Sequence, residues 1–140
     1  MVDSIHVRPG VLVPEEAMDF HAVRAGGPGG QNVNKVASKV ELRVSLDGIV
    51  GLDPDARARL RALCAGRLDA EGRLVVTSQL TRDQHKNLQD ARDKVRVLVA
   101  RSLVRPRKRR PTRPTRSSVE RRLSDKRHRS TKKSDRRGDD

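Results

Sequence analysis

The stretch most open to chemistry in this 140-residue sequence is "RAGGPGGQNVNK", residues 24–35. Four glycines and a proline fill the five positions before Gln31, so a glutamine stands beside unusually free backbone. The stretch contains no Ser, Cys or Asp nucleophile, and it lacks the G-x-x-x-x-G-K-S/T spacing of a phosphate-binding loop. Two interpretations remain open at this point: a flexible loop that contains a glutamine by chance, or a loop in which Gln31 does chemistry.

Histidine chemistry is poorly supported by the sequence. The four histidines, at positions 6, 21, 85 and 128, are scattered, which is not typical of a hydrolase triad. His21 lies nearest to the glycine-rich stretch. It is either a general base or, as we favour, an exposed residue on one face of a strand.

Two predicted strands flank the glycine-rich stretch. Residues 18–25, "MDFHAVRA", alternate imperfectly between two faces. Residues 40–46, "VELRVSL", alternate cleanly between apolar and polar side chains, as a half-buried antiparallel strand does. The residues between them are too many for a tight turn, so they predict a long loop between neighbouring strands.

A helix and a third strand are predicted next. Asp53 and Pro54 have the character of an N-cap and a first helical residue, and apolar residues at helical spacing follow as far as Cys64. Gly66 is predicted to end this helix. Residues 71–79 predict a short strand rich in β-branched side chains.

A second helix is predicted to reach about Leu103, with Thr81 and Gln84 forming a capping box at its start. Its apolar stripe consists of Leu88, Ala91, Val95, Leu98 and Val99. The order β-β-α-β-α, with both helices on one face of a mostly antiparallel sheet, predicts a small α+β sandwich over residues 1–104.

The charge of the chain is concentrated beyond this domain. The net charge is +14, and residues 105–140 carry 16 Lys and Arg against five Asp and Glu. Such a basic segment is typical of an arm that binds nucleic acid. Residues 105–116, with three prolines, predict an extended linker, and residues 117–140 predict a basic tail.

The tail has a possible capping box, Ser117 with Glu120, but almost no apolar residues besides Val119 and Leu123. Two apolar residues cannot stabilise an isolated helix. We therefore expect a tail that is disordered when free and helical only on a polyanion. The same lack of an apolar face argues against insertion into a membrane surface.

Composition excludes several other classes. No apolar run is long enough to span a membrane, and the first 20 residues lack a secretory or transit pattern, so we expect a cytoplasmic protein. Cys64 is the only cysteine, so no disulfide within the chain and no cysteine metal cluster is expected. Phe20 is the only aromatic residue, which makes base stacking an unsuitable way to bind RNA and favours contacts with phosphates and with RNA shape.

Two longer strings carry a family resemblance. "RAGGPGGQNVNKVASKVELRV" resembles the catalytic loop of class I translation release factors. "RRPTRPTRSSVERRLSDK" resembles the C-terminal extension of the peptidyl-tRNA hydrolases that rescue stalled ribosomes, the alternative ribosome-rescue factor B type. The resemblance covers roughly residues 15–137, nearly the whole chain.

The resemblance implies a release-factor-like catalytic domain in which Gly29, Gly30 and Gln31 are catalytic. In this family the loop enters the peptidyl-transferase centre of the large ribosomal subunit, where water attacks the ester between nascent peptide and tRNA. The backbone N–H of Gln31 would stabilise the developing negative charge, and its side chain would shape the pocket of the water. Arg24, Lys35 and Lys39 would contact ribosomal RNA.

The resemblance also gives the tail a location, the mRNA entry channel of the small subunit, which is accessible only when downstream mRNA is absent or short. The family's functional residues there fall on Arg110, Pro114, Arg122, Leu123, Lys126, Lys133 and Arg136.

The resulting hypothesis is codon-independent hydrolysis of peptidyl-tRNA on ribosomes stalled on non-stop or truncated mRNA. The chain leaves no room for stop-codon-reading domains. The expected partners are a 70S-type ribosome and peptidyl-tRNA, with no membrane, metal or cofactor, and we expect a monomer. The alternatives are a non-catalytic ribosome- or RNA-binding protein, and a hydrolase that needs a helper protein to sense the stall.

Overall fold

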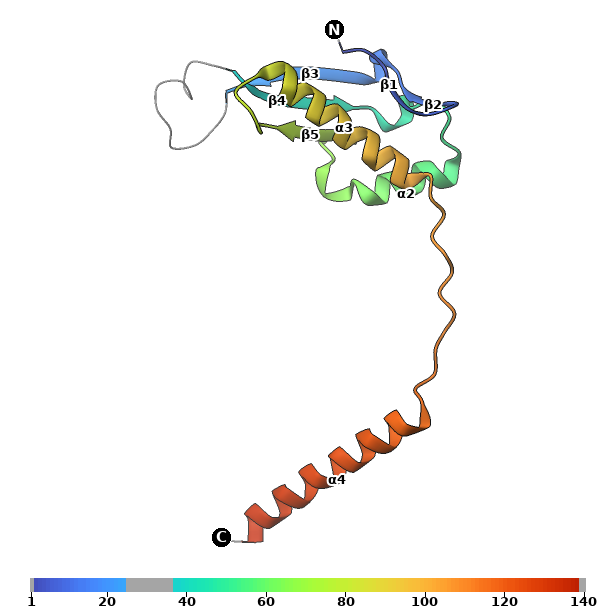
Figure 1. The fold of residues 1–140 in the computed structure, drawn as a ribbon, viewed down its shortest axis with the longest axis vertical. Coiled ribbons are helices and arrows are strands. Elements are labelled where there is room, and N and C mark those ends of the chain that lie inside the picture. The colour runs from blue at the N-terminus through green and yellow to red at the C-terminus, as the bar shows by residue number, and fades with distance from the viewer. Residues whose placement is uncertain (1, 25–36, 139–140) are drawn as a thin grey trace. The chain divides into compact units, whose positions relative to one another are not determined.

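A computed structural model describes residues 2–24 and 37–138 of the chain (Figure 1). It contains two compact units, residues 1–106 and residues 107–140. The first unit holds every strand of the described structure and two of its α-helices, and the second holds one long helix.

An antiparallel three-stranded sheet forms the centre of the first unit. Its strands are β3 (Met18–Val23), β4 (Lys39–Val44) and β5 (Leu74–Ser78), with β4 in the middle. The predicted alternation of β4 is confirmed, because every second residue from Val40 is buried. The three predicted strands are longer than the observed ones. Leu46, for example, lies in the 3-10 turn Leu46–Gly48 and is buried there.

One face of the sheet is covered by helix α3 (Gln84–Ser102), which crosses it in Figure 1, and helix α2 (Pro54–Leu63) packs against α3. Arg59 joins the two helices, since its Nε donates to the carbonyl of Ser102 over 2.7 Å. The apolar stripe predicted for the second helix is confirmed on α3, with its members buried except for the half-buried Leu88.

The N-terminal residues form a hairpin that the sequence analysis did not anticipate. Strands β1 (Ile5–Arg8) and β2 (Val11–Val13) pair with each other in a separate two-stranded sheet. The hairpin is fixed to the domain by reciprocal backbone hydrogen bonds between Leu12 and Val50. The neighbouring Gly51 has φ +88°, and a Cβ there would lie 2.0 Å from the carbonyl oxygen of Gly10, so only glycine fits.

The α+β class is therefore confirmed, but the order β-β-α-β-α is incomplete, because β1 and β2 precede it. The core shared by the sheet, the hairpin and both helices includes these fully buried side chains: Ile5, Val13, Val40, Leu42, Val44, Leu60, Cys64, Leu74, Ala91, Val95 and Val99. Burial raises the pKa of the Cys64 thiol, as expected for an inert core cysteine.

The helix ends follow the predictions in part. The N-cap of α2 is confirmed, since Asp53 Oδ1 accepts a hydrogen bond from the N–H of Ala56 over 2.6 Å. The predicted end at Gly66 is wrong. Helix α2 ends at Leu63, and Gly66 lies in a separate 3-10 turn, Ala65–Arg67, closed by a bond from the Arg67 N–H to the carbonyl of Cys64.

The capping box predicted at Thr81 and Gln84 is also wrong. Asp83 is the N-cap of α3, and its Oδ1 accepts from the N–H groups of His85 at 2.9 Å and Lys86 at 3.4 Å. An aspartate directly before the first helical residue reaches these donors, so the hydroxyl of Thr81 is left for other partners.

The second unit begins without regular structure and continues as helix α4 (Arg116–Gly138). The helix starts one residue before the predicted cap, and Thr115 Oγ1 accepts from the N–H of Ser118 over 3.3 Å. Ser117 is therefore a helical residue and not the cap. No side chain of α4 is buried. Disorder of this segment away from a polyanion stays a prediction.

Within residues 2–24 and 37–138, none of the helices has the length and apolar character needed to cross a membrane.

Candidate functional site

The ends of the glycine-rich stretch meet at one end of the sheet. Val23, the last residue of β3, pairs with Lys39, the first residue of β4. Residues 25–36 connect these strands, and Gly29, Gly30, Gln31 and Lys35 lie among them, outside the described residues. The structure therefore defines the base from which the predicted catalytic stretch leaves and to which it returns.

A buried amide ties this base to the start of α3. Asn87 is fully buried, and its Nδ2 donates to the carbonyl of Ser38 at 2.7 Å and to the carbonyl of Thr81 at 2.8 Å. Its Oδ1 accepts from the N–H of Thr81 at 2.9 Å and from the Thr81 hydroxyl at 3.0 Å. Ser38 directly precedes β4, so the returning end of the stretch is bonded to the connection between β5 and α3.

A second buried contact holds the same end of β5 to α3. Ser78 pairs with Val40 in the sheet and is buried, and its hydroxyl donates to Asp90 Oδ2 over 2.7 Å. Lys94 lies one turn further along α3 and approaches the same carboxylate at 2.7 Å. These bonds, first with Lys94 and then with Ser78, hold the pKa of Asp90 below its ordinary value.

The surface around the base carries unpaired positive charge. Arg24 is exposed beyond β3, Lys39 is half-buried, and Arg82 and Lys86 are exposed at the start of α3. None of the four makes an ion pair with another described residue. Such a group of cations suits phosphate oxygens. The sequence analysis named Arg24 and Lys39 but missed Arg82 and Lys86.

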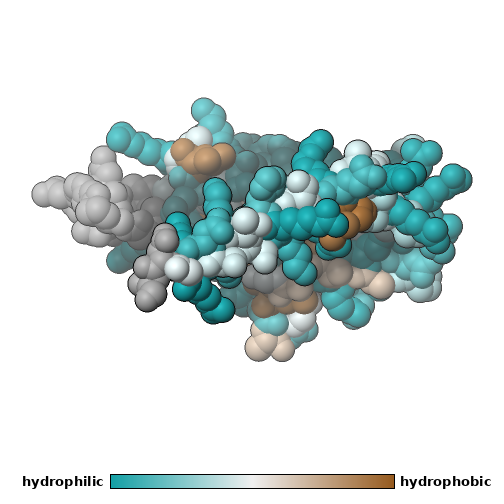
Figure 2. Space-filling model, turned by 90° about the horizontal axis from the view of Figure 1, so that it is seen from below, coloured by the Kyte–Doolittle hydropathy of each residue, from teal (hydrophilic) through white to brown (hydrophobic). Residues whose placement is uncertain are grey.

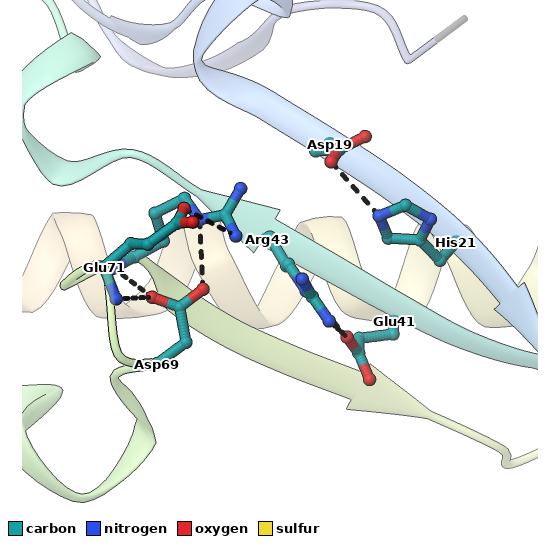
Figure 3. Close-up of polar contacts among 7 residues, drawn as sticks. Asp19, His21, Glu41, Arg43, Asp69 and Glu71 are labelled. Carbon is teal, nitrogen blue, oxygen red and sulfur yellow. Dashed lines mark hydrogen bonds and ion pairs between the residues drawn. The ribbon is translucent and has the colours of Figure 1, made fainter.

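On the outer face of the sheet, several polar side chains contact one another in pairs (Figure 3). His21 Nε2 lies 3.1 Å from Asp19 Oδ2, and both side chains are about half exposed. On the neighbouring strand Arg43 is paired with Glu41 at 2.7 Å, which raises the pKa of the arginine. His21 is therefore a strand surface residue with a local partner, as favoured from the sequence.

The same face ends at a turn built by Asp69 (Figure 3). Its Oδ1 accepts from the N–H groups of Glu71 at 3.0 Å and Arg73 at 2.9 Å, and its Oδ2 lies 3.0 Å from Arg73 Nε. The bond from the Arg73 N–H is the main cause that lowers the pKa of Asp69. This cluster orders the turn before β5 and is distant in sequence from the loop base.

The predicted tail residues fall in two settings. Arg110 and Pro114 are exposed in the segment between Val104 and α4 that has no helix or strand. Arg122, Lys126 and Lys133 lie on one face of α4, because residues four, seven and eleven apart share a helical face. Arg129 belongs to that face, and Leu123 and Arg136 border it. Two acidic residues of the helix, Glu120 and Asp135, lie off this face. Asp125 borders it, because it stands four positions before Arg129.

The hydrophobic side chains on the described surface are scattered. The face shown in Figure 2 is mostly hydrophilic, and its hydrophobic side chains form small separate areas. Exposed large hydrophobic residues occur at Val50, Leu63, Leu80, Val97, Val104 and Leu123. Across residues 2–24 and 37–138, no three His, Cys, Asp or Glu side chains gather in a way that could hold a metal ion.

The chain belongs to the RF-1 domain family, whose model matches residues 5–139. It is 39% identical over 126 residues to the peptidyl-tRNA hydrolase ArfB of Pseudomonas putida, an alignment that covers 90% of this chain and 91% of that protein. It is 34% identical to the large ribosomal subunit protein mL62 of Mus musculus, over 63% of this chain and 43% of that protein. The chloroplastic peptide chain release factor PrfB1 of Arabidopsis thaliana is 33% identical over 50% of this chain and 15% of its own length.

The sequence analysis missed the residues that brace the loop base, although one signal was present. Asn87 stands four residues before Ala91 and eight before Val95, so it continues the apolar stripe of α3 with a polar side chain. A polar residue on a buried stripe indicates a specific hydrogen-bonding task. No comparable sequence signal indicated the contact between Ser78 and Asp90, because that contact depends on how α3 lies on the sheet.

The Asp90 contact predicts a pH dependence of stability. Asp90→Asn removes the charge but keeps an oxygen that can accept from Ser78. Because the folded-state pKa is lowered, the ionised carboxylate stabilises the fold above the pH at which unfolded aspartate ionises, and this stabilisation is lost as pH falls. The difference in unfolding free energy between the unaltered chain and Asp90→Asn should be constant above about pH 5 and shrink as the pH falls below about 4.

Urea unfolding followed by circular dichroism at several pH values measures this difference. A difference that stays the same from neutral to acid pH would contradict the proposed role of the Asp90 charge.

Proposed function

We propose that this chain is a ribosome-dependent peptidyl-tRNA hydrolase that releases nascent peptides from ribosomes stalled on non-stop or truncated mRNA, without reading a codon. The observation that carries the proposal is the match along almost the whole chain to a peptidyl-tRNA hydrolase, including both the glycine-rich stretch and the basic tail. The site of action would be the cytoplasm, on a 70S-type ribosome, and the protein would act as a monomer.

The proposed chemistry is ester hydrolysis in the peptidyl-transferase centre. A water oxygen attacks the carbonyl carbon of the ester that joins the peptide to the terminal ribose of tRNA. The carbonyl oxygen gains negative charge, which the N–H of Gln31 stabilises as an oxyanion-type donor. The bond to the ribose oxygen then breaks, and a proton from the water ends on that oxygen. One such donor accounts for about 10²–10³ in rate in other enzymes.

The glycines before Gln31 serve this donor, because a Cβ would hinder the close approach of the backbone to an RNA-lined centre. The protein needs no acid–base pair of its own, since positioning of the ester and water contributes a large part of the rate. A non-catalytic RNA-binding protein would gain nothing from Gly29, Gly30 and Gln31, so we favour the hydrolase.

The charges around the loop base would contact ribosomal RNA near the peptidyl-transferase centre. Arg24, Lys35 and Lys39 are joined in this role by Arg82 and Lys86, which the structure adds to the same end of the domain. Their role is to orient the loop, because phosphate contacts fix register and orientation.

The tail would restrict activity to ribosomes whose mRNA entry channel is empty. Arg110 and Pro114 would lie on the path into the channel, and the cationic face of α4 would lie against its RNA wall. Counterion release drives such binding and makes it steeply dependent on salt. A tail that senses the empty channel makes a separate helper protein unnecessary.

The loop is tested by peptide release from purified ribosomes stalled with no mRNA downstream of the decoding site. Gln31→Ala should lower the release rate because it removes the side chain that shapes the water pocket. Gln31→Pro should lower it further, by about 10²–10³ or more, because it also removes the backbone N–H. Cosedimentation with ribosomes should show unchanged binding for both variants.

His21→Ala is the control for a protein-borne base, and it should release peptide at the unaltered rate. Undiminished release by Gln31→Pro, or loss of release in His21→Ala, would overturn the proposed chemistry.

The cationic face of α4 is tested by two triple variants with the same change in charge. Lys126→Gln, Arg129→Gln and Lys133→Gln together remove three charges from that face. They should raise the half-saturating protein concentration about tenfold or more, and they should reduce the salt dependence of binding by about one unit of log–log slope per lost phosphate contact.

The matched variant, Arg121→Gln with Arg127→Gln and Lys132→Gln, removes three charges from elsewhere on the helix and should have a much smaller effect. Equal effects of the two triples would indicate a nonspecific basic arm in place of an oriented helix.

A further inference from the structure

We infer that Asn87 is a positioning residue for the Gly-Gly-Gln stretch, acting through the carbonyl of Ser38. This inference rests on the proposed hydrolase function and adds to it a residue that does not touch the substrate. Asn87 lies in the first turn of α3, 49 positions from Ser38 in sequence, and it bonds α3 to the residue directly before β4.

The hydrogen-bonding capacity of Asn87 is completely used. Its two amide hydrogens go to the carbonyls of Ser38 and Thr81, and its oxygen accepts from the Thr81 N–H. The Thr81 hydroxyl lies 3.0 Å from both the Asn87 oxygen and the Asp83 carbonyl, which share its one hydrogen. The partners fix the orientation of the amide, because a carbonyl can only accept and a backbone N–H can only donate. No other amino acid side chain of this size supplies two donors and an acceptor in this arrangement.

Burial of the Asn87 amide costs folding free energy unless its hydrogen bonds compensate for the lost contacts with water. It occupies the buried stripe that Ala91 and Val95 continue, where an apolar side chain would avoid the desolvation of an amide. The amide instead satisfies the backbone of two segments that belong to no helix or strand, residues 37–38 and 79–83. These are the segments beside the loop base, so the bonds fix the point at which the stretch rejoins the sheet.

Asn87 projects from a helix that is capped and packed on the sheet. Asp83 caps α3 beside Thr81, and the apolar stripe of α3 is packed on the sheet. A displacement of Ser38 would be transmitted to the stretch that precedes it. Misplacement of a reacting group by about 1 Å can cost about 100-fold in rate even when the change is distant from the chemistry.

A matched control is available on the same helix. Ser102 is also a fully buried polar residue of α3, but it lies at the opposite end, and its hydroxyl donates locally to the carbonyl of Val99 over 2.6 Å. Ser102→Ala therefore removes a buried hydrogen bond without altering the loop base.

The test measures peptide release by the full-length chain at increasing protein concentration on stalled ribosomes with no downstream mRNA. Asn87→Asp keeps an acceptor for the Thr81 N–H but has no N–H for the carbonyls of Ser38 and Thr81, so it breaks the bond to Ser38. The plateau release rate should fall about 10- to 100-fold while the half-saturating concentration changes by less than about threefold. Ser102→Ala should keep the unaltered plateau.

The plateau separates positioning from mere stability. Loss of stability lowers the amount of folded protein, so it raises the half-saturating total concentration and leaves the plateau unchanged. Circular dichroism at the assay temperature establishes that each variant is folded. Asn87→Ala, which introduces no buried charge, carries the test if Asn87→Asp does not fold.

An unaltered plateau for a folded Asn87 variant would overturn the positioning role alone. Absence of release by the unaltered chain would overturn the proposed function and the inference with it.

Discussion

The structure depends on one rung of backbone pairing, where Val23 at the end of β3 meets Lys39 at the start of β4. Both ends of the Gly-Gly-Gln stretch are attached at this rung. The pair is stable because β4 is the central strand, with Val40, Leu42 and Val44 buried beneath α3.

The rest of the domain supports that rung. Asn87 and Asp90 project from α3 to Ser38 and to Ser78, so the loop base is held on the side of β4 and on the side of β5. The hairpin β1–β2 contributes Ile5 and Val13 to the core. In the proposed mechanism, the domain would hold the backbone N–H of Gln31, and the ribosome would supply the remainder of the active centre.

Sequence patterns were sufficient wherever a local rule operated. The alternation of β4, the Asp53 cap and the apolar stripe of α3 each depend on neighbouring residues, and each is confirmed. The hairpin β1–β2 was missed because its strands are short and its stability comes from distant partners such as Val50. The cap of α3 was misassigned because Thr81 and Asp83 both suit an N-terminus, and only the three-dimensional path of the chain decides between them. The role of Asn87 was missed for a similar reason, because its partner Ser38 is distant in sequence.

The central claim is that this chain hydrolyses peptidyl-tRNA only where the mRNA channel is empty. The most direct measurement compares peptide release by the unaltered chain from two sets of ribosomes. In one set the mRNA ends at the decoding site, and in the other it continues through the entry channel without a stop codon. The account predicts fast release from the first set and strongly reduced release from the second. Equal release from both sets would contradict it.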